Sequence, residues 1–159
     1  MIIILVIPNI LFALTVDQKA VIKECYNESL FFGLEEVIPV ICLIESSAGI
    51  SKIGDDETSF GILQIKLTTA KWFLEKNDIY LSNKLLKEYL INDNKFSIVV
   101  ACSYLNYLLY KNKGDMSKAV LSYNVGLSNV RKNGLNFDPN NYLIKFNIYK
   151  KLIDKEINF

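Results

Sequence analysis

The sequence contains no histidine among its 159 residues. This absence excludes every mechanism that needs an imidazole base, including Ser-His-Asp and Cys-His nucleophile systems, and it excludes histidine-rich metal sites. Any proton transfer by side chains therefore has to rest on carboxylates. Neither a cofactor nor a metal is expected.

An excess of one charge is also missing. Lysine and arginine number 18, aspartate and glutamate number 17, and the net charge is +1. Because no basic tract is long enough to form a phosphate-binding face, nucleic acid is excluded as the expected partner. The length is that of one domain, which predicts one hydrophobic core and one active site.

Cysteine is scarce, and the three residues fit no metal-binding spacing. Cys42 and Cys102 lie in apolar helical runs, where a free thiol behaves as a small hydrophobic group, and we interpret all three as core residues. A bridge between Cys25 and Cys42 stays open in an oxidising compartment, because the sequence cannot supply the required geometry.

The first fourteen residues, MIIILVIPNILFAL, carry no charge and are almost wholly apolar. This composition is typical of the core of a signal peptide, although no basic residue precedes it and no clear small-residue cleavage site follows. We therefore expect residues 1–15 to be a signal peptide or an N-terminal apolar segment, and residues 16–159 to be the domain. The expected location is the periplasm or cell envelope, after export. The alternative is a segment that folds onto the core.

Helical periodicity dominates the rest of the chain, and glycine marks the exceptions. Six of the seven glycines fall in two windows, 49–61 and 114–134. Irregular backbone held by a rigid helical scaffold is where binding and catalytic groups tend to lie, so a cleft is expected between these windows. Helices are predicted over 17–32, 34–46, 67–76, 81–90, 96–110, 117–123 and 142–153.

An apolar stripe leads to one carboxylate. In the helix predicted over 34–46, Ile38, Ile41, Cys42 and Glu45 share a face at spacings of three and four. Cleavage of a glycosidic bond needs a proton on the leaving oxygen, and a carboxylic acid supplies it near neutral pH when an apolar setting raises its pKa. Glu45 has such a setting. The alternative is an ordinary exposed glutamate at a helix end.

Three short segments carry a resemblance to a known family. They are Glu45-Ser46, then Ser59-Phe60-Gly61-Ile62-Leu63-Gln64 followed by Thr69-Ala70, and finally Ser122-Tyr123-Asn124-Val125-Gly126. Their order and spacing resemble the E-S, G-L-M-Q, T-A and A-Y-N-x-G motifs of the soluble lytic transglycosylases. The resemblance covers roughly residues 34–150 and implies a mainly α, lysozyme-like fold with a small irregular or β-hairpin lobe.

The resemblance also implies a reaction and a set of site residues. It makes Glu45 the single catalytic acid and base in peptidoglycan cleavage between N-acetylmuramic acid and N-acetylglucosamine, with the muramic acid C6 hydroxyl as nucleophile. Ser59, Gly61 and Gln64 would bind the sugar, Tyr123 would support the positive charge near C1, and Asn124 would position that segment. A polar turn or a core tyrosine is the competing interpretation of these residues.

Departures from the family pattern, such as Lys66-Leu67 in place of Met-Pro, indicate a divergent branch. The small stand-alone enzymes that open the wall for a secretion, conjugation or phage apparatus are such a branch, and a monomer is expected. The nearest rival function is a goose-type lysozyme-like hydrolase with Asp55 or Asp56 as base. A lysozyme-fold module that only binds glycan and a membrane-anchored helical interaction protein are the further alternatives.

Overall fold

The computed structural model describes residues 13–54 and 56–159, so most of the expected apolar leader lies outside the described residues. The elements follow one another as α1 (Val16–Ser29), η1 (Leu30–Phe32), α2 (Ile38–Ser46), β1 (Ser59–Phe60), β2 (Ile65–Lys66), α3 (Leu67–Glu75), α4 (Asn83–Asn92), α5 (Asn94–Lys111), α6 (Met116–Val125), α7 (Leu127–Asn133), η2 (Gly134–Asn136) and α8 (Tyr142–Glu156). The predicted mainly α fold with a small hairpin lobe is confirmed.

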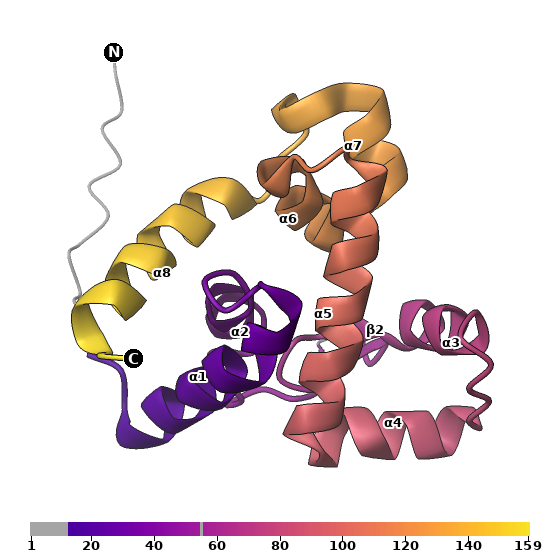
Figure 1. The fold of residues 1–159 in the computed structure, drawn as a ribbon, viewed down its shortest axis with the longest axis horizontal. Coiled ribbons are helices and arrows are strands. Elements are labelled where there is room, and N and C mark those ends of the chain that lie inside the picture. Colours follow the sequence, from indigo (N-terminus) through magenta and orange to yellow (C-terminus); the bar gives the residue numbers. More distant parts are fainter. Residues whose placement is uncertain (1–12, 55) are drawn as a thin grey trace.

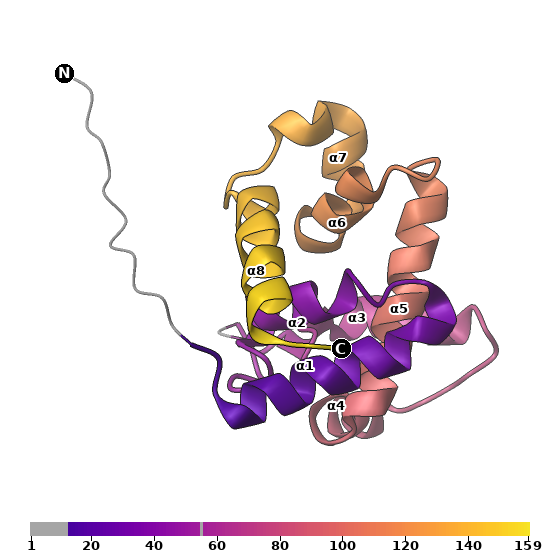
Figure 2. The same ribbon diagram turned by 60° about the vertical axis from the view of Figure 1, so that its left-hand side comes forward.

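The long helix α5 forms the axis of the domain (Figure 1). Helices α1 and α2 pack on one side of it and α3 and α4 on the other, while α6 packs against the part of α5 near its C-terminal end and α7 packs against α6. Turning the view shows α8 crossing beside α2 and closing that side of the domain (Figure 2). The helix predicted over 96–110 is therefore confirmed, although Val99 and Tyr110 on it are exposed.

Helix α2 is the most deeply buried element near the expected cleft. All six residues from Ile38 to Leu43 are buried, which the apolar run predicts. The helix begins at Ile38 rather than at Leu34, because Pro39 lies in its first turn, where a missing N–H costs no intrahelical hydrogen bond. Burying this face rigidly fixes the position of the residues that follow, including Glu45.

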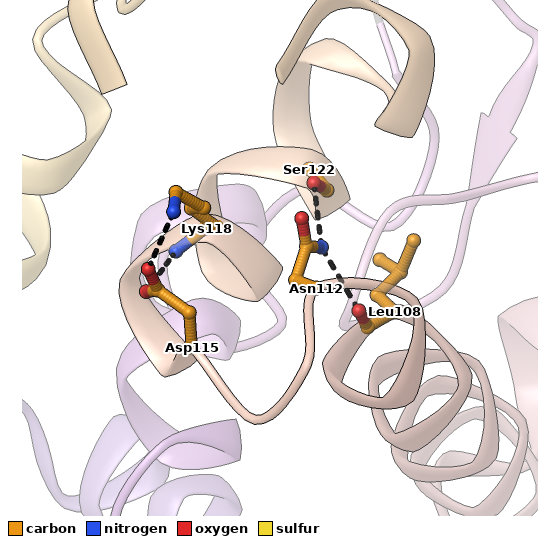
Figure 3. A network of polar contacts seen from close by, with 5 residues as sticks. All are labelled: Leu108, Asn112, Asp115, Lys118 and Ser122. Carbon is orange, nitrogen blue, oxygen red and sulfur yellow. Dashed lines mark hydrogen bonds and ion pairs between the residues drawn. The ribbon is translucent and has the colours of Figure 1, made fainter. Parts of the chain in front are cut away.

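Four helices, α1, α4, α5 and α6, start one or two residues away from the predicted position. Helix α1 begins at Val16, and Thr15 caps it in a capping box with Gln18. Helix α6 begins at Met116 and is capped by Asp115, whose carboxylate accepts a hydrogen bond from the Lys118 backbone N–H at 3.0 Å. The same carboxylate forms an ion pair with the Lys118 ammonium, also at 3.0 Å (Figure 3).

The segment between Gly126 and Gly134, predicted as a loop, contains α7. Both glycines have positive φ, 89° and 64°, and they mark the two ends of the helix rather than a continuous irregular stretch. Val130 is 2% exposed and anchors the helix to the core. The prediction was wrong because seven residues are too few for a clear helical period.

The three cysteines are buried and free, which confirms their interpretation as core residues. Burial raises the pKa of the Cys102 thiol to about 12. A hydrogen bond with Cys42, together with burial, raises the pKa of Cys25 well above its usual range. No helix among residues 13–54 and 56–159 has the length and apolar character that crossing a membrane requires.

Candidate active site

Glu45 lies in the last turn of α2, where the chain leaves the buried helix. Ser46, the next residue, is buried and fixes this helix end: its hydroxyl donates to the Ile62 carbonyl at 2.6 Å and accepts from the Gly49 N–H at 2.8 Å. Ser47 then adopts the left-handed conformation and ends the helix. The glutamate-serine pair therefore joins α2 directly to the turn that carries the second motif.

A cavity of about 260 Å³ opens beside the Glu45 carboxyl. It is formed by the end of α2, the loop that follows, strand β1, the turn before β2 and the end of α6. Its lining residues are Glu45, Ser51, Gly54, Ser59, Gln64, Tyr123 and Asn124. Residues from all three motifs, up to 79 positions apart in the chain, thus surround one hollow.

Opposing effects set the ionisation of Glu45. Burial raises its pKa, while a hydrogen bond from Tyr142, the Asn124 amide and the charge of Lys145 lower it, and burial is the largest effect. The Tyr142 hydroxyl donates to Glu45 Oε1 at 2.6 Å. Tyr142 is 2% exposed, and burial raises its own pKa well above the usual range, so it remains a neutral donor. Glu45 thus holds a proton to higher pH than a solvated glutamate.

Gln64 holds the loop that borders the cavity. Its backbone has φ of 46°, and its side-chain N–H groups donate to the Gly61 and Ser51 carbonyls at 2.8 and 3.1 Å. The amide oxygen faces Gly54, where a Cβ would lie 2.9 Å from it. Gly54 therefore leaves room for the Gln64 amide. Because the N–H groups of this amide are already hydrogen-bonded, its oxygen is the group that can accept a hydrogen bond from a ligand in the cavity.

Gly61 does not line the cavity. Its φ is 82°, and a Cβ at this position would lie 2.3 Å from the Leu90 carbonyl oxygen and 2.7 Å from Ser97 Oγ. The absence of a side chain lets the turn pack against the end of α4 and the start of α5. This close packing accounts for the glycine, while a contact with sugar stays a prediction.

The third motif reaches the cavity from α6. Tyr123 lines the cavity, and its hydroxyl donates to the Leu63 carbonyl at 2.9 Å. The same helix is held at its other side by Asn112, which donates to Ser122 Oγ, next to Tyr123, at 3.2 Å and to the Leu108 carbonyl at 2.9 Å (Figure 3). Tyr123 is therefore positioned from two directions, by the second motif and by the loop after α5.

A family model described as Transglycosylase SLT domain matches residues 33–142. The match covers more than half of the chain and includes all the motif residues around the cavity. The chain belongs to the transglycosylase SLT domain family. Comparison with the curated proteins and with the solved structures found no match.

Membership in this family supports a glycan-cleaving function of the lytic transglycosylase type, with peptidoglycan in the cell envelope as the substrate. It also agrees with the lysozyme-like arrangement of helices around a two-stranded antiparallel sheet. The matched region ends at Tyr142, the residue whose hydroxyl meets the Glu45 carboxyl.

Tyr142, Ser51 and Gly54 are site residues that the sequence reasoning missed. Tyr142 lies 97 positions from Glu45, and none of the recognised motifs includes it. Its place is fixed by Asp138, whose carboxylate accepts from the Tyr142 and Leu143 backbone N–H groups at 2.6 and 3.0 Å. The available signal was Asp138 itself, an acceptor for free backbone N–H groups shortly before the helix predicted to begin at Tyr142.

The acidic loop predicted as a rival source of a base does not reach the cavity in its described part. Asp56 is exposed and accepts hydrogen bonds from the Thr58 hydroxyl and N–H at 2.7 and 3.1 Å, which lower its pKa. Glu57 is also exposed, and Asp55 lies outside the described residues. Of the described residues that line the cavity, Glu45 is the one with an ionisable carboxyl.

Proposed function

We propose that this SLT-domain protein is a peptidoglycan lytic transglycosylase that cleaves the β-1,4 bond between N-acetylmuramic acid and N-acetylglucosamine and leaves 1,6-anhydro-muramic acid ends. The observation that carries the proposal is the Glu45 carboxyl, buried enough to have a raised pKa and open to a cavity lined by three motifs of the family. A raised pKa is what a carboxylic acid needs in order to protonate a glycosidic oxygen near neutral pH.

In the proposed reaction Glu45 acts twice. Its carboxylic acid gives a proton to the glycosidic oxygen as the bond from this oxygen to C1 of muramic acid breaks. The C6 hydroxyl of the same muramic acid then bonds to C1, and its proton returns to the Glu45 carboxylate. The hydrogen bond from Tyr142 Oη to Glu45 Oε1 stabilises the ionised form that exists between these two steps.

Tyr123 and Asn124 take part from α6 in this proposal. Tyr123 supports the positive charge that develops near C1, and the hydrogen bond from its hydroxyl to the Leu63 carbonyl holds the side chain in the position that this role requires. The Asn124 amide lies beside the Glu45 carboxyl and favours its ionised form. Ser59 and the Gln64 amide oxygen offer polar contacts to the sugar from the opposite wall.

A goose-type hydrolase remains the second candidate, because Asp55 in the acidic loop could supply the base that activates water. The single carboxyl among the described lining residues favours the internal nucleophile. A module that only binds glycan would have no use for a protonated carboxyl beside the cavity. Released muramic acid ends distinguish the candidates, because an internal nucleophile adds no water.

The test is digestion of purified sacculi in heavy-oxygen water, with mass spectrometry of the released muropeptides. We expect 1,6-anhydro ends that carry no label. Glu45→Gln should lower the release by at least about two orders of magnitude, the lower end for loss of a positioned acid-base group. Glu88→Gln, a matched change of an exposed glutamate on α4, serves as the control.

Two outcomes would overturn the proposal. Labelled reducing ends would make the reaction a hydrolysis and direct attention to Asp55 and Asp56. Retained activity of Glu45→Gln would remove Glu45 from its assigned role.

Export is proposed on the composition of residues 1–14, which are uncharged and almost wholly apolar. A tagged full-length chain expressed in a Gram-negative host should fractionate with the periplasm or envelope. A variant with Lys in place of Ile4 and Ile10 interrupts the apolar run and should stay in the cytosol. Recovery of the unchanged chain in the cytosol would contradict the proposal.

A further inference from the structure

The Glu45 cavity continues into a groove along α5. A second hollow, about 130 Å³, shares Gln64, Tyr123 and Asn124 with the first. A third, about 270 Å³, shares Thr69 and Tyr104 with the second. The three hollows therefore join end to end, and the groove is longer than the part beside Glu45.

Aromatic rings line the whole length of this groove. The Tyr123 ring lies 5.8 Å from that of Tyr104, centroid to centroid, and Tyr104 lies 6.3 Å from Tyr107 with an angle of 17° between the rings. Trp72 of α3 then meets Tyr107 edge-on at 5.3 Å. Tyr104 and Tyr107 are three residues apart on α5 and so share one face of that helix.

The far end of the groove combines this aromatic wall with hydroxyl groups. Thr68 and Thr69, in the first turn of α3, line the third hollow together with Trp72, Tyr107 and Leu127 of α7. The ammonium of Lys76 lies 4.5 Å from the Trp72 ring centroid, which is within the range of a cation–π contact. The tryptophan ring is therefore held in place by neighbours on two sides before any ligand arrives.

We propose that Trp72 and Tyr107 form a sugar-binding subsite. It holds a further sugar of the glycan strand that is cut beside Glu45, at a distance along the strand from the bond that breaks. The inference rests on the proposed function, since it extends the same groove. A pyranose ring has an apolar face of C–H groups and an edge of hydroxyl groups. The ring faces of Trp72 and Tyr107 can pack against the C–H face of the sugar, and the threonine hydroxyls can form hydrogen bonds with its hydroxyl edge.

Because the groove is continuous with the Glu45 cavity, we infer that the occupant of the Trp72 subsite is the glycan strand. A β-1,4-linked strand bound at Glu45 has to leave the cavity along a groove, and the aromatic row begins at Tyr123, within the cavity. Stem peptides are branches on the lactyl groups of muramic acid and would not need a platform in line with the backbone of the strand. Binding at this end would make long strands better substrates than short ones.

The chain carries its own reporter for this subsite, because Trp72 is its single tryptophan. The probe is a peptide-free glycan strand of at least eight sugars, prepared by amidase treatment of sacculi and added to Glu45→Gln protein. We expect a saturable change in tryptophan emission. Unchanged emission while co-sedimentation or calorimetry shows that the protein is saturated with strand would overturn the proposal. An emission change that appears only with strands that carry stem peptides would also overturn it.

A kinetic comparison provides the second test. The ratio of kcat/KM for eight-sugar strands to that for four-sugar strands should fall about tenfold in Trp72→Ala, by comparison with other aromatic platforms that stack ring-shaped ligands. Tyr110→Ala is the matched control. Tyr110 lies one turn beyond Tyr107 on α5, is 77% exposed and lines none of the three hollows. Its ratio should equal that of the unchanged protein.

The two proposals fail in different ways. An unchanged ratio in Trp72→Ala, together with released 1,6-anhydro ends, would remove the subsite and leave the proposed function intact. Labelled reducing ends would refute the transglycosylase reaction, while the emission of Trp72 would still report whether a strand occupies the groove.

Discussion

Replacing Tyr142 by phenylalanine removes one hydroxyl from the proposed site and leaves its ring in place. The hydroxyl donates to Glu45 Oε1 at 2.6 Å from a side chain that is 2% exposed. This bond favours the ionised carboxylate and lowers the pKa of Glu45 against the effect of burial. Without this hydrogen bond, Asn124 and Lys145 remain to counteract the effect of burial, and the pKa of Glu45 should rise further.

The size of the effect follows from the kind of bond that is lost. A hydrogen bond to a charged group contributes about 1.5–3 kcal/mol. In the proposed reaction Glu45 has to be protonated to act as the acid, so activity should fall at high pH as it loses its proton, and this limb of the pH profile should report its pKa. The limb should move to higher pH by one unit for each 1.36 kcal/mol of lost carboxylate stabilisation. Turnover at neutral pH should fall, since the ionised form that accepts the C6 proton is less stable.

The assay is kcat/KM for peptide-free glycan strands measured across pH for the unchanged protein and for Tyr142→Phe. Tyr149→Phe is the control, because Tyr149 lies two turns further along α8 and does not line the cavity. Its profile should overlay that of the unchanged protein. A high-pH limb that stays in place or moves to lower pH in Tyr142→Phe would refute the assigned hydrogen bond.

Three further predictions concern the same region. Tyr123→Phe should lower turnover and reduce the free energy of unfolding by only about 1 kcal/mol, the contribution of one hydrogen bond; full turnover would make Tyr123 a packing residue. Gly61→Ala should destabilise the fold by about 2 kcal/mol or more in urea titration, because the left-handed backbone and the Leu90 carbonyl at 2.3 Å both oppose a Cβ; an unchanged midpoint would contradict this packing. The raised pKa of Glu45 means that the folded state holds its proton to higher pH than the unfolded state, so stability falls as pH rises from about 4.3 through the folded pKa. Glu45→Gln should therefore melt at a higher temperature than the unchanged protein at neutral pH and not below pH 4, and equal melting at both would contradict the raised pKa.

Much of the scaffold follows from sequence periodicity. The apolar face of α2 and the length of α5 are visible in the sequence, because a buried helix repeats its apolar residues every three to four positions. Caps and short helices were harder to predict. Thr15 and Asp115 compete with neighbouring residues of similar capping ability, and α7 has only seven residues, of which one is buried.

The candidate site was predictable where it follows local motifs and not where it depends on tertiary packing. Residues Glu45, Ser59, Gln64, Tyr123 and Asn124 come together around one cavity, as their motifs predict. Tyr142 could not be found in this way, since its position depends on how α8 crosses α2 (Figure 2). The packing of Gly61 likewise depends on the ends of α4 and α5, which no local pattern around the glycine describes.

In the proposed reaction a single carboxyl both gives and takes a proton, and the environment of Glu45 contains groups that favour each of its two forms. Burial at the end of α2 favours the protonated acid, which the first proton transfer needs. Tyr142 and Lys145 of α8, with Asn124 of α6, favour the carboxylate, which the second transfer needs. The carboxyl is carried by α2, and the polar groups that favour its ionised form come from α6 and α8, later in the chain. A change that separates α8 from α2 should therefore leave an acid that donates its proton but recovers it poorly, whereas a change within α2 should weaken donation first.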